Sequence, residues 1–182
     1  MIARTFSLVL GILSLTTAAG TQVKSILVPV SGVLLLSCAY RLEKAIQRLE
    51  GVDRVKVQMG PVRAEVTPKA DAWVEAARLR RAIQSAGFKP GDLRYTVTGT
   101  LTQWRGQPAL RFGSSERLLV LQAQPAAPAA YERAQRALSE AGRVPACGRA
   151  VEVEGEFVDR AVPADGTSPA SLRIGRLELK DQ

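Results

Sequence analysis

The spacing of apolar residues after position 38 constrains this chain more than any other feature, because it changes type from one segment to the next. From 42 to 49 the apolar residues recur at helical spacing, and Gly51 then follows as a helix cap would. Valine and alanine alternate with polar residues in the segments on either side of Gly60-Pro61. This pattern predicts one amphipathic helix followed by two half-buried strands joined by a turn.

A second helix is predicted over 72–86. Its apolar residues fall mostly on one side, Asp71 is placed to cap its first turn, and Gly87 closes it. With an apolar strand before Cys38, the order becomes strand, helix, strand, strand, helix. One more strand completes a ferredoxin-like βαββαβ unit, which we expect over residues 25–92 as the first domain of an α+β chain.

Residues 94–180 predict a second domain that is rich in strands. Three strands, one helix and two further strands are expected there, at 94–104, 109–112, 118–121, 131–141, 151–157 and 172–179. Gly99 and Gly155 stand inside long strands, where glycine permits the tight coiling of a small barrel. The order is similar to an OB-fold, a small β-barrel with one helix.

The residues around the first helix have a recognisable spacing. Gly32 stands six residues before Cys38, Gly51 stands thirteen residues after it, and the second helix ends in Gly87-Phe88. In these features the segment 25–92 resembles the heavy-metal-associated domain, the fold of copper chaperones, periplasmic mercury-binding proteins and the N-terminal modules of metal-pumping ATPases. The resemblance implies a soft metal ion of the Cu or Hg type, held between the two cysteine thiolates of a Gly-Met-x-Cys-x-x-Cys loop.

The sequence departs from that motif at two positions. Leu35 stands where the first cysteine belongs and Val33 where the methionine belongs, which leaves Cys38 as the metal-binding candidate. The chain has no His that would replace the missing thiolate. Chelation within one chain is therefore not expected. The alternative is a shared site, in which Cys38 of two molecules holds the ion or Cys38 passes it to a thiol of a partner.

Residues 1–20 predict an export signal. Arg4 precedes an apolar stretch from 6 to 15, and the small residues Thr17-Ala18-Ala19 follow. An uncleaved membrane anchor is the alternative interpretation. Both interpretations place the rest of the chain outside the cytoplasm, in the periplasm or attached to the membrane of the cell envelope.

Cys38 has two further interpretations. The apolar run 26–36, followed by Ser37-Cys38, also resembles a bacterial lipoprotein signal, whose cysteine is lipidated after cleavage. Cleavage there would remove the first strand of the domain, so we favour the strand. In an oxidising compartment Cys38 and Cys147 are also candidates for a disulfide between the two domains.

Composition narrows the classes of function. Without His and with two Cys, the chain excludes a Ser-His-Asp triad, a Cys-His dyad and a zinc site of four Cys or His ligands. No paired acid site or phosphate loop stands out, so no enzyme is predicted. Glu152, Glu154 and Glu156 alternate along a strand and indicate a solvent face, or alternatively a weak calcium site.

The predicted function is therefore that of an exported two-domain binding protein. Its expected partner is another envelope protein or a second copy of the chain, with membrane anchoring as a further option. Nucleic acid is not an expected partner, because the few aromatic residues of the second domain fall at core positions. The alternative function is an envelope carrier of Cu- or Hg-type ions that uses Cys38 in a shared site.

Overall fold

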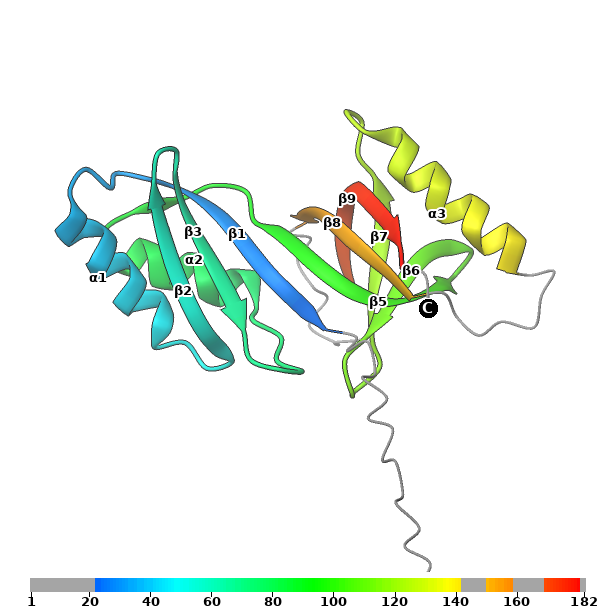
Figure 1. Cartoon of the computed structure of the whole chain (residues 1–182), viewed down its shortest axis with the longest axis horizontal. Helices are drawn as coiled ribbons and strands as arrows, with labels where there is room; N and C mark the ends of the chain where they lie inside the picture. The colour runs from blue at the N-terminus through cyan, green and yellow to red at the C-terminus, as the bar shows by residue number, and fades with distance from the viewer. Residues whose placement is uncertain (1–21, 142–149, 159–168, 181–182) are drawn as a thin grey trace, which may run out of the picture.

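The computed structural model describes residues 22–141, 150–158 and 169–180 of the chain (Figure 1). Its elements in chain order are β1 (Val23–Ser31), α1 (Leu36–Gln47), β2 (Val52–Met59), β3 (Val62–Pro68), α2 (Ala76–Ser85), β4 (Lys89–Pro90), β5 (Arg94–Trp104), β6 (Gln107–Phe112), β7 (Arg117–Ala123), α3 (Pro128–Ala141), β8 (Ala150–Val158) and β9 (Ala170–Leu179). Among the described residues, no helix is long and apolar enough to span a bilayer. The predicted export signal and Cys147 lie outside these ranges.

The first half has the ferredoxin-like arrangement that the sequence predicts. Its strands pair in the order β2-β3-β1, all antiparallel, and β1 then pairs with β5. Helix α1 packs against β2 and α2. Each helix buries one face, and the side chains of that face pack with the buried side chains of the sheet in one core. The buried helical residues are Ala39, Leu42 and Ile46 of α1 and Ala76, Leu79 and Ile83 of α2.

Two predicted helix boundaries of the first half are wrong. Helix α1 ends at Gln47, and Gly51, with a φ of +84°, turns the chain into β2 instead of capping the helix. Helix α2 begins at Ala76 because the preceding residues run extended: Val74 is buried and Trp73 packs against aromatic rings of the second half. Asp71 does not cap α2, and its Oδ1 instead accepts a hydrogen bond from the backbone N–H of Ser114 at 3.3 Å.

Helix α3 begins earlier than its predicted start at residue 131. Its first residue is Pro128, three residues before the predicted start. Proline suits the first position of a helix because its missing N–H has no partner there in any case. The buried side chains Ala130, Ala134 and Ala137 follow at helical spacing and face the strands, mainly β9 and β7.

Strand β5 belongs to both halves. Its first residues pair with β1, with Tyr95 opposite Ile26, and its last residues pair with β6. From 94 to 100 it also pairs with β8. Figure 1 shows β5 as a long curved ribbon that runs from one half into the other. The two halves therefore share one continuous sheet.

The second half is rich in strands, as predicted. Strands β5, β6, β7, β9 and β8 each pair with two others of this group, and the pairings close into a ring because β8 returns to β5. The β7–β9 pair is parallel, and the remaining pairs are antiparallel. At Gly155 a Cβ atom would lie 2.4 Å from the carbonyl oxygen of Arg173, so this close approach of backbones requires a glycine.

Pro29 lies inside β1, although proline cannot donate to a strand ladder. The partner on one side of β1 changes near this position: the pairing with β5 ends at Leu27, and the pairing with β4 begins at Val30. The Pro29 carbonyl accepts a hydrogen bond from the N–H of Gly91 at 2.8 Å. The missing N–H therefore falls at the break between two partner strands.

Candidate functional site

The loop that holds Cys38 follows the last residue of β1. Gly32 has a φ of +95°, a conformation that favours glycine, and it turns the chain out of the sheet. Leu35 is the N-cap of α1 and has no polar atom that would cap the helix, and its carbonyl accepts bonds from the N–H groups of Cys38 (3.0 Å) and Ala39 (3.2 Å). Cys38 therefore lies in the first turn of α1, where the resemblance places it.

The side chains of this loop divide into two sets. Val33 is buried, and Cys38 is half-buried against the edge of the core. Leu34, Leu35 and Leu36 are exposed to solvent. The loop thus presents three consecutive leucines, and Leu35 occupies the position that the resemblance assigns to the first metal-binding cysteine.

Phe88 packs beneath this loop, next to Gly32. It is buried, and its ring lies 3.9 Å from the position of a Cβ on Gly32. The guanidinium of Arg41 lies over the same ring, 5.2 Å from its centroid. The aromatic residue after Gly87 is therefore next to the Cys38 loop.

The donor atoms near Cys38 do not fit a site for a soft ion held between two thiolates. Cys38 supplies one sulfur, and neither Leu35 nor Val33 has a donor atom. Met59 at the end of β2 carries a thioether, which is a neutral and weaker ligand than a thiolate. Within the described ranges, no group of three or more His, Cys, Asp or Glu side chains is arranged to hold a metal ion.

The predicted disulfide involves Cys147, outside these ranges, and stays a prediction.

Three segments meet at this end of the first half. Ser31 at the end of β1 pairs with Lys89, and Pro29 pairs with Arg63, which brings the β2–β3 turn alongside the Cys38 loop. Figure 1 shows the loop before α1 and the β2–β3 hairpin at the same end. We call residues 31–41, 58–63 and 87–90 the tip.

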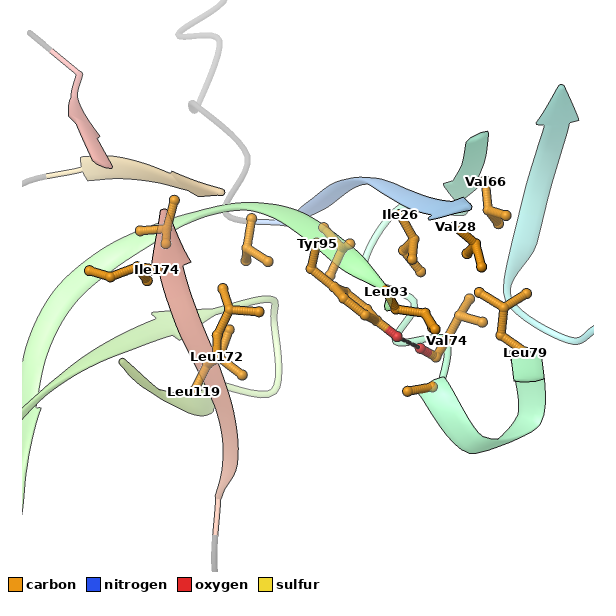
Figure 2. Packing of buried hydrophobic residues seen from close by; sticks show 14 of the residues in the cluster. Ile26, Val28, Val66, Val74, Leu79, Leu93, Tyr95, Leu119, Leu172 and Ile174 are labelled. Carbon is orange, nitrogen blue, oxygen red and sulfur yellow. Dashed lines mark hydrogen bonds between the residues drawn. The ribbon is translucent and has the colours of Figure 1, made fainter. Parts of the chain in front are cut away.

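A second cluster lies at the opposite end of β3, between the two halves. Trp73 stacks on Tyr95, with ring centroids 5.3 Å apart, and also contacts the rings of Phe112 and Phe157. The Tyr95 hydroxyl donates a hydrogen bond to the carbonyl oxygen of Val74 at 3.0 Å. Burial raises the pKa of Tyr95 well above its ordinary value. Figure 2 shows Tyr95 between the buried side chains of the two halves.

This aromatic cluster was only partly predicted. The sequence assigned the aromatic residues of the second half to a core, and three of them do pack there. It did not indicate that Trp73 of the first half joins them. Trp73 lies inside the segment predicted as a helix, next to Val74, which does not share the helix face of Leu79 and Ile83. This break in the helical spacing was the available signal.

Two of the three carboxylates in the acidic row on β8 pair with cations of the chain. Oε2 of Glu152 lies 2.5 Å from Nζ of Lys24 and 3.1 Å from Nζ of Lys180, and Glu156 faces Arg173 at 3.9 Å. The hydrogen bond from Lys24 holds the pKa of Glu152 below its ordinary value. The carboxylates of Glu152 and Glu156 therefore serve ion pairs, and the calcium alternative has no support in the described residues.

A shallow cleft of about 500 Å³ lies between α3 and β9. Its charged lining side chains are exposed ones, contributed by Arg133, Arg136, Glu178 and Lys180. Buried, mutually oriented titratable groups are the usual mark of a catalytic pocket. This cleft does not present such groups.

Comparisons with known proteins concern the first half. Residues 30–89 match the family model described as the heavy-metal-associated domain. Similar solved structures include a copper binding domain from HMA7, a P-type ATPase, with 26% identity over 37% of this chain and 90% of that chain and a TM-score of 0.35. Another is oxidized MerP from Ralstonia metallidurans CH34, with 29% identity over 38% of this chain and 94% of that chain and a TM-score of 0.35.

A third similar structure is a putative copper-ion-binding protein from Bacillus anthracis str. Ames, with 25% identity over 38% of this chain and 96% of that chain and a TM-score of 0.35. A search of curated proteins gave no match. The family match covers the loop, both helices and the strands between them. Residues 30–89 of this chain are therefore similar to the heavy-metal-associated domain.

Proposed function

We propose that this chain is an exported, non-enzymatic binding protein whose heavy-metal-associated domain recognises another component of the cell envelope and does not chelate a soft metal on its own. The observation that carries this proposal is Leu35, which exposes a hydrocarbon side chain where a second thiolate would be needed. Cu(I) and Hg(II) are held by soft sulfur ligands, and the Cys38 thiolate has no second sulfur ligand at position 35.

The second half supports a binding role. Its closed ring of pairings, the parallel β7–β9 pair and the helix between its third and fourth strands are features of an OB-fold-like barrel. Barrels that bind nucleic acid stack bases on exposed aromatic rings. Here Tyr95 and Phe112 are buried in the junction with the first half. A protein or membrane partner is therefore the better proposal.

Export is proposed from the pattern of residues 1–20. The structure also bears on lipoprotein processing at Cys38, because cleavage before that residue would remove β1. This strand lies between β3 and β5, and its side chains Ile26 and Val28 are fully buried. Its removal would leave β3 and β5 without their common partner, so we propose that β1 is retained.

A Cu(I) competition titration tests the absence of chelation. The full chain, Leu35→Cys, Leu34→Cys and Cys38→Ser are titrated anaerobically against a chromogenic Cu(I) chelator. We expect one-to-one uptake only for Leu35→Cys, because it alone restores two thiols at the Cys-x-x-Cys spacing. Leu34→Cys is the matched control, with the same added thiol at the wrong spacing. Tight uptake by the unmodified chain that is lost in Cys38→Ser would overturn the proposal.

The alternative is a carrier with a metal site shared between chains. One observation favours it: the Cys38 thiol is partly accessible beside exposed leucines, where a second copy can approach. Light scattering with and without Cu(I) distinguishes the two functions. Dimers that need both Cu(I) and Cys38 would establish the carrier, and a monomer under both conditions would exclude the shared site.

A further inference from the structure

We propose that the tip of the heavy-metal-associated domain is a membrane-binding surface that places Leu34, Leu35 and Leu36 into the interface of an anionic bilayer. The inference rests on the proposed function in one respect, namely that a recognition surface stands where the family holds its metal. The first support is exposure. Of the large apolar side chains that are exposed in the described residues, all but Leu179 lie at the tip: Leu34 (84%), Leu36 (78%), Leu35 (65%), Tyr40 (62%) and Met59 (38%).

This clustering is not what a free surface usually shows. Single exposed apolar residues are common on proteins, whereas contiguous ones mark contact surfaces. Leu36 and Tyr40 are four residues apart on α1 and therefore lie on one side of the helix. Met59 reaches the same end through the β2–β3 hairpin. The apolar patch is thus built from two separate segments of the fold.

The second support is charge. The tip contains Arg41, Arg63 and Lys89, and its sequence ranges contain no Asp or Glu. Lys44, one turn further along α1, lies over the Tyr40 ring at 5.4 Å from its centroid. The nearby Glu43 accepts a hydrogen bond from the backbone N–H of Val57 at 2.8 Å, which directs its carboxylate toward β2.

Exposed apolar side chains together with cations and no carboxylate in the same ranges match the chemistry of an anionic lipid surface. The leucines would replace water by acyl chain, Tyr40 suits the headgroup level, and the cations would pair with lipid phosphates. A second copy of the chain fits less well. Two tips facing each other would bring Arg41, Arg63 and Lys89 of both copies together, and like charges repel.

A local probe tests the proposal without interference from residues 1–21. In the full chain with Cys38→Ser and Cys147→Ser, an environment-sensitive fluorophore is attached through Leu34→Cys, or through Leu179→Cys as a control. Vesicles contain phosphatidylcholine alone or with 30% phosphatidylglycerol. We expect a blue shift and increased intensity for the probe at position 34 with the anionic vesicles, and little change at position 179, which lies on β9.

The strength of membrane binding is measured as partitioning of the protein into the same vesicles. For this measurement the fluorophore is attached through Leu35→Cys. Leu34→Ser with Leu36→Ser should then lower the partitioning by about tenfold or more, since the burial of two exposed leucines in the bilayer is lost. Lys89→Gln should lower it roughly fivefold on anionic vesicles only. Lys69→Gln is the matched control, because Lys69 is exposed beyond the other end of β3.

Two results would overturn the proposal. One is a probe at position 34 that responds to vesicles no more than the probe at position 179. The other is shielding of position 34 that depends on protein concentration and not on lipid, which would assign the tip to a second copy. The copper titration is a separate measurement. Failure of vesicle binding together with absent chelation would leave the proposed recognition function standing with a protein partner.

Discussion

Tyr95 offers the sharpest test of how the two halves are joined. Its side chain is fully buried on β5, its hydroxyl donates to the Val74 carbonyl at 3.0 Å, and its ring stacks on Trp73. Tyr95→Phe keeps the ring and removes only the hydroxyl. The loss of stability should therefore report the hydrogen bond across the junction and not a cavity.

The expected magnitude follows from the burial of both partners. A typical hydrogen bond contributes about 1 kcal/mol net, but a buried carbonyl left without its donor costs roughly 1–3 kcal/mol. Val74 is only 2% exposed, so water does not readily replace the hydroxyl. With a urea m-value of about 2 kcal/mol per molar, the unfolding midpoint should fall by roughly 0.5–1.5 M.

Urea unfolding followed by circular dichroism and by Trp fluorescence measures this change. Tyr40→Phe is the control, because Tyr40 is exposed and its substitution should alter the free energy of unfolding by less than about 0.5 kcal/mol. Both signals should change in one transition, since the halves share β5 and one core. If the two variants shift the midpoint equally, the hydroxyl does not stabilise the junction and the reasoning is wrong.

The same residue predicts a pH dependence at the alkaline end. The pKa of Tyr95 is raised by burial above its unfolded value of about 10. A group with a raised folded pKa contributes stability that is complete below the unfolded pKa and is lost as the pH rises toward the folded pKa. The unmodified chain should therefore lose stability above about pH 10, and Tyr95→Phe should lose less over the same interval.

Three further predictions concern the second half and the contacts between the halves. Gly155→Ala should lower the free energy of unfolding by more than about 2 kcal/mol in thermal unfolding, because its Cβ would lie 2.4 Å from the Arg173 carbonyl oxygen. Gly60→Ala is the control and should cost little, because a Cβ there would have nothing within 4 Å. Similar effects of the two substitutions would contradict the close approach at Gly155. Glu152→Gln should lower stability at pH 7, and its difference from the unmodified chain should disappear as the pH falls into the acid range. The lowered pKa of Glu152 contributes stability above its unfolded pKa that is lost as the pH falls through the folded pKa, so a constant difference across this range would contradict the ion pairs. Trp73→Ala should cost roughly 2–3 kcal/mol by the same unfolding assay, less than a fully buried Trp would, because Trp73 is half-buried. A loss below about 1 kcal/mol would mean that the aromatic cluster does not hold the halves together.

Local spacing in the sequence was sufficient for most elements of the first half. The helix and the two strands after Cys38 were predicted because helical and alternating patterns are set by neighbours in sequence. The end of α2 was also predicted, since the N–H groups of Gly87 and Phe88 bond back to the last turn of the helix. The start of α2 was not, because Trp73 is held by residues that are distant in sequence.

The sequence predicted the position of the candidate site, but it did not predict that Leu34, Leu35 and Leu36 are exposed there. The spacings from Gly32 and Gly51 placed Cys38 at the start of a helix, and the structure confirms this. The apolar run through Leu36 was interpreted as one continuous strand or a signal, because sequence alone does not show which apolar residues are covered. The turn at Gly32 sends the chain out of the sheet, and the leucines after Val33 therefore have no core to enter.

The position of the tip relative to the second half follows from the same topology. Strand β1 begins at Val23, which pairs with β5 at the junction, and ends at Ser31 in the tip. Eight steps of about 3.3 Å separate these residues by roughly 26 Å. The ion pair of Lys24 with Glu152 and the bond from Ser114 to Asp71 hold the junction end. A bilayer bound at the tip would therefore hold the second half at a fixed distance, through a shared sheet and not through a flexible linker.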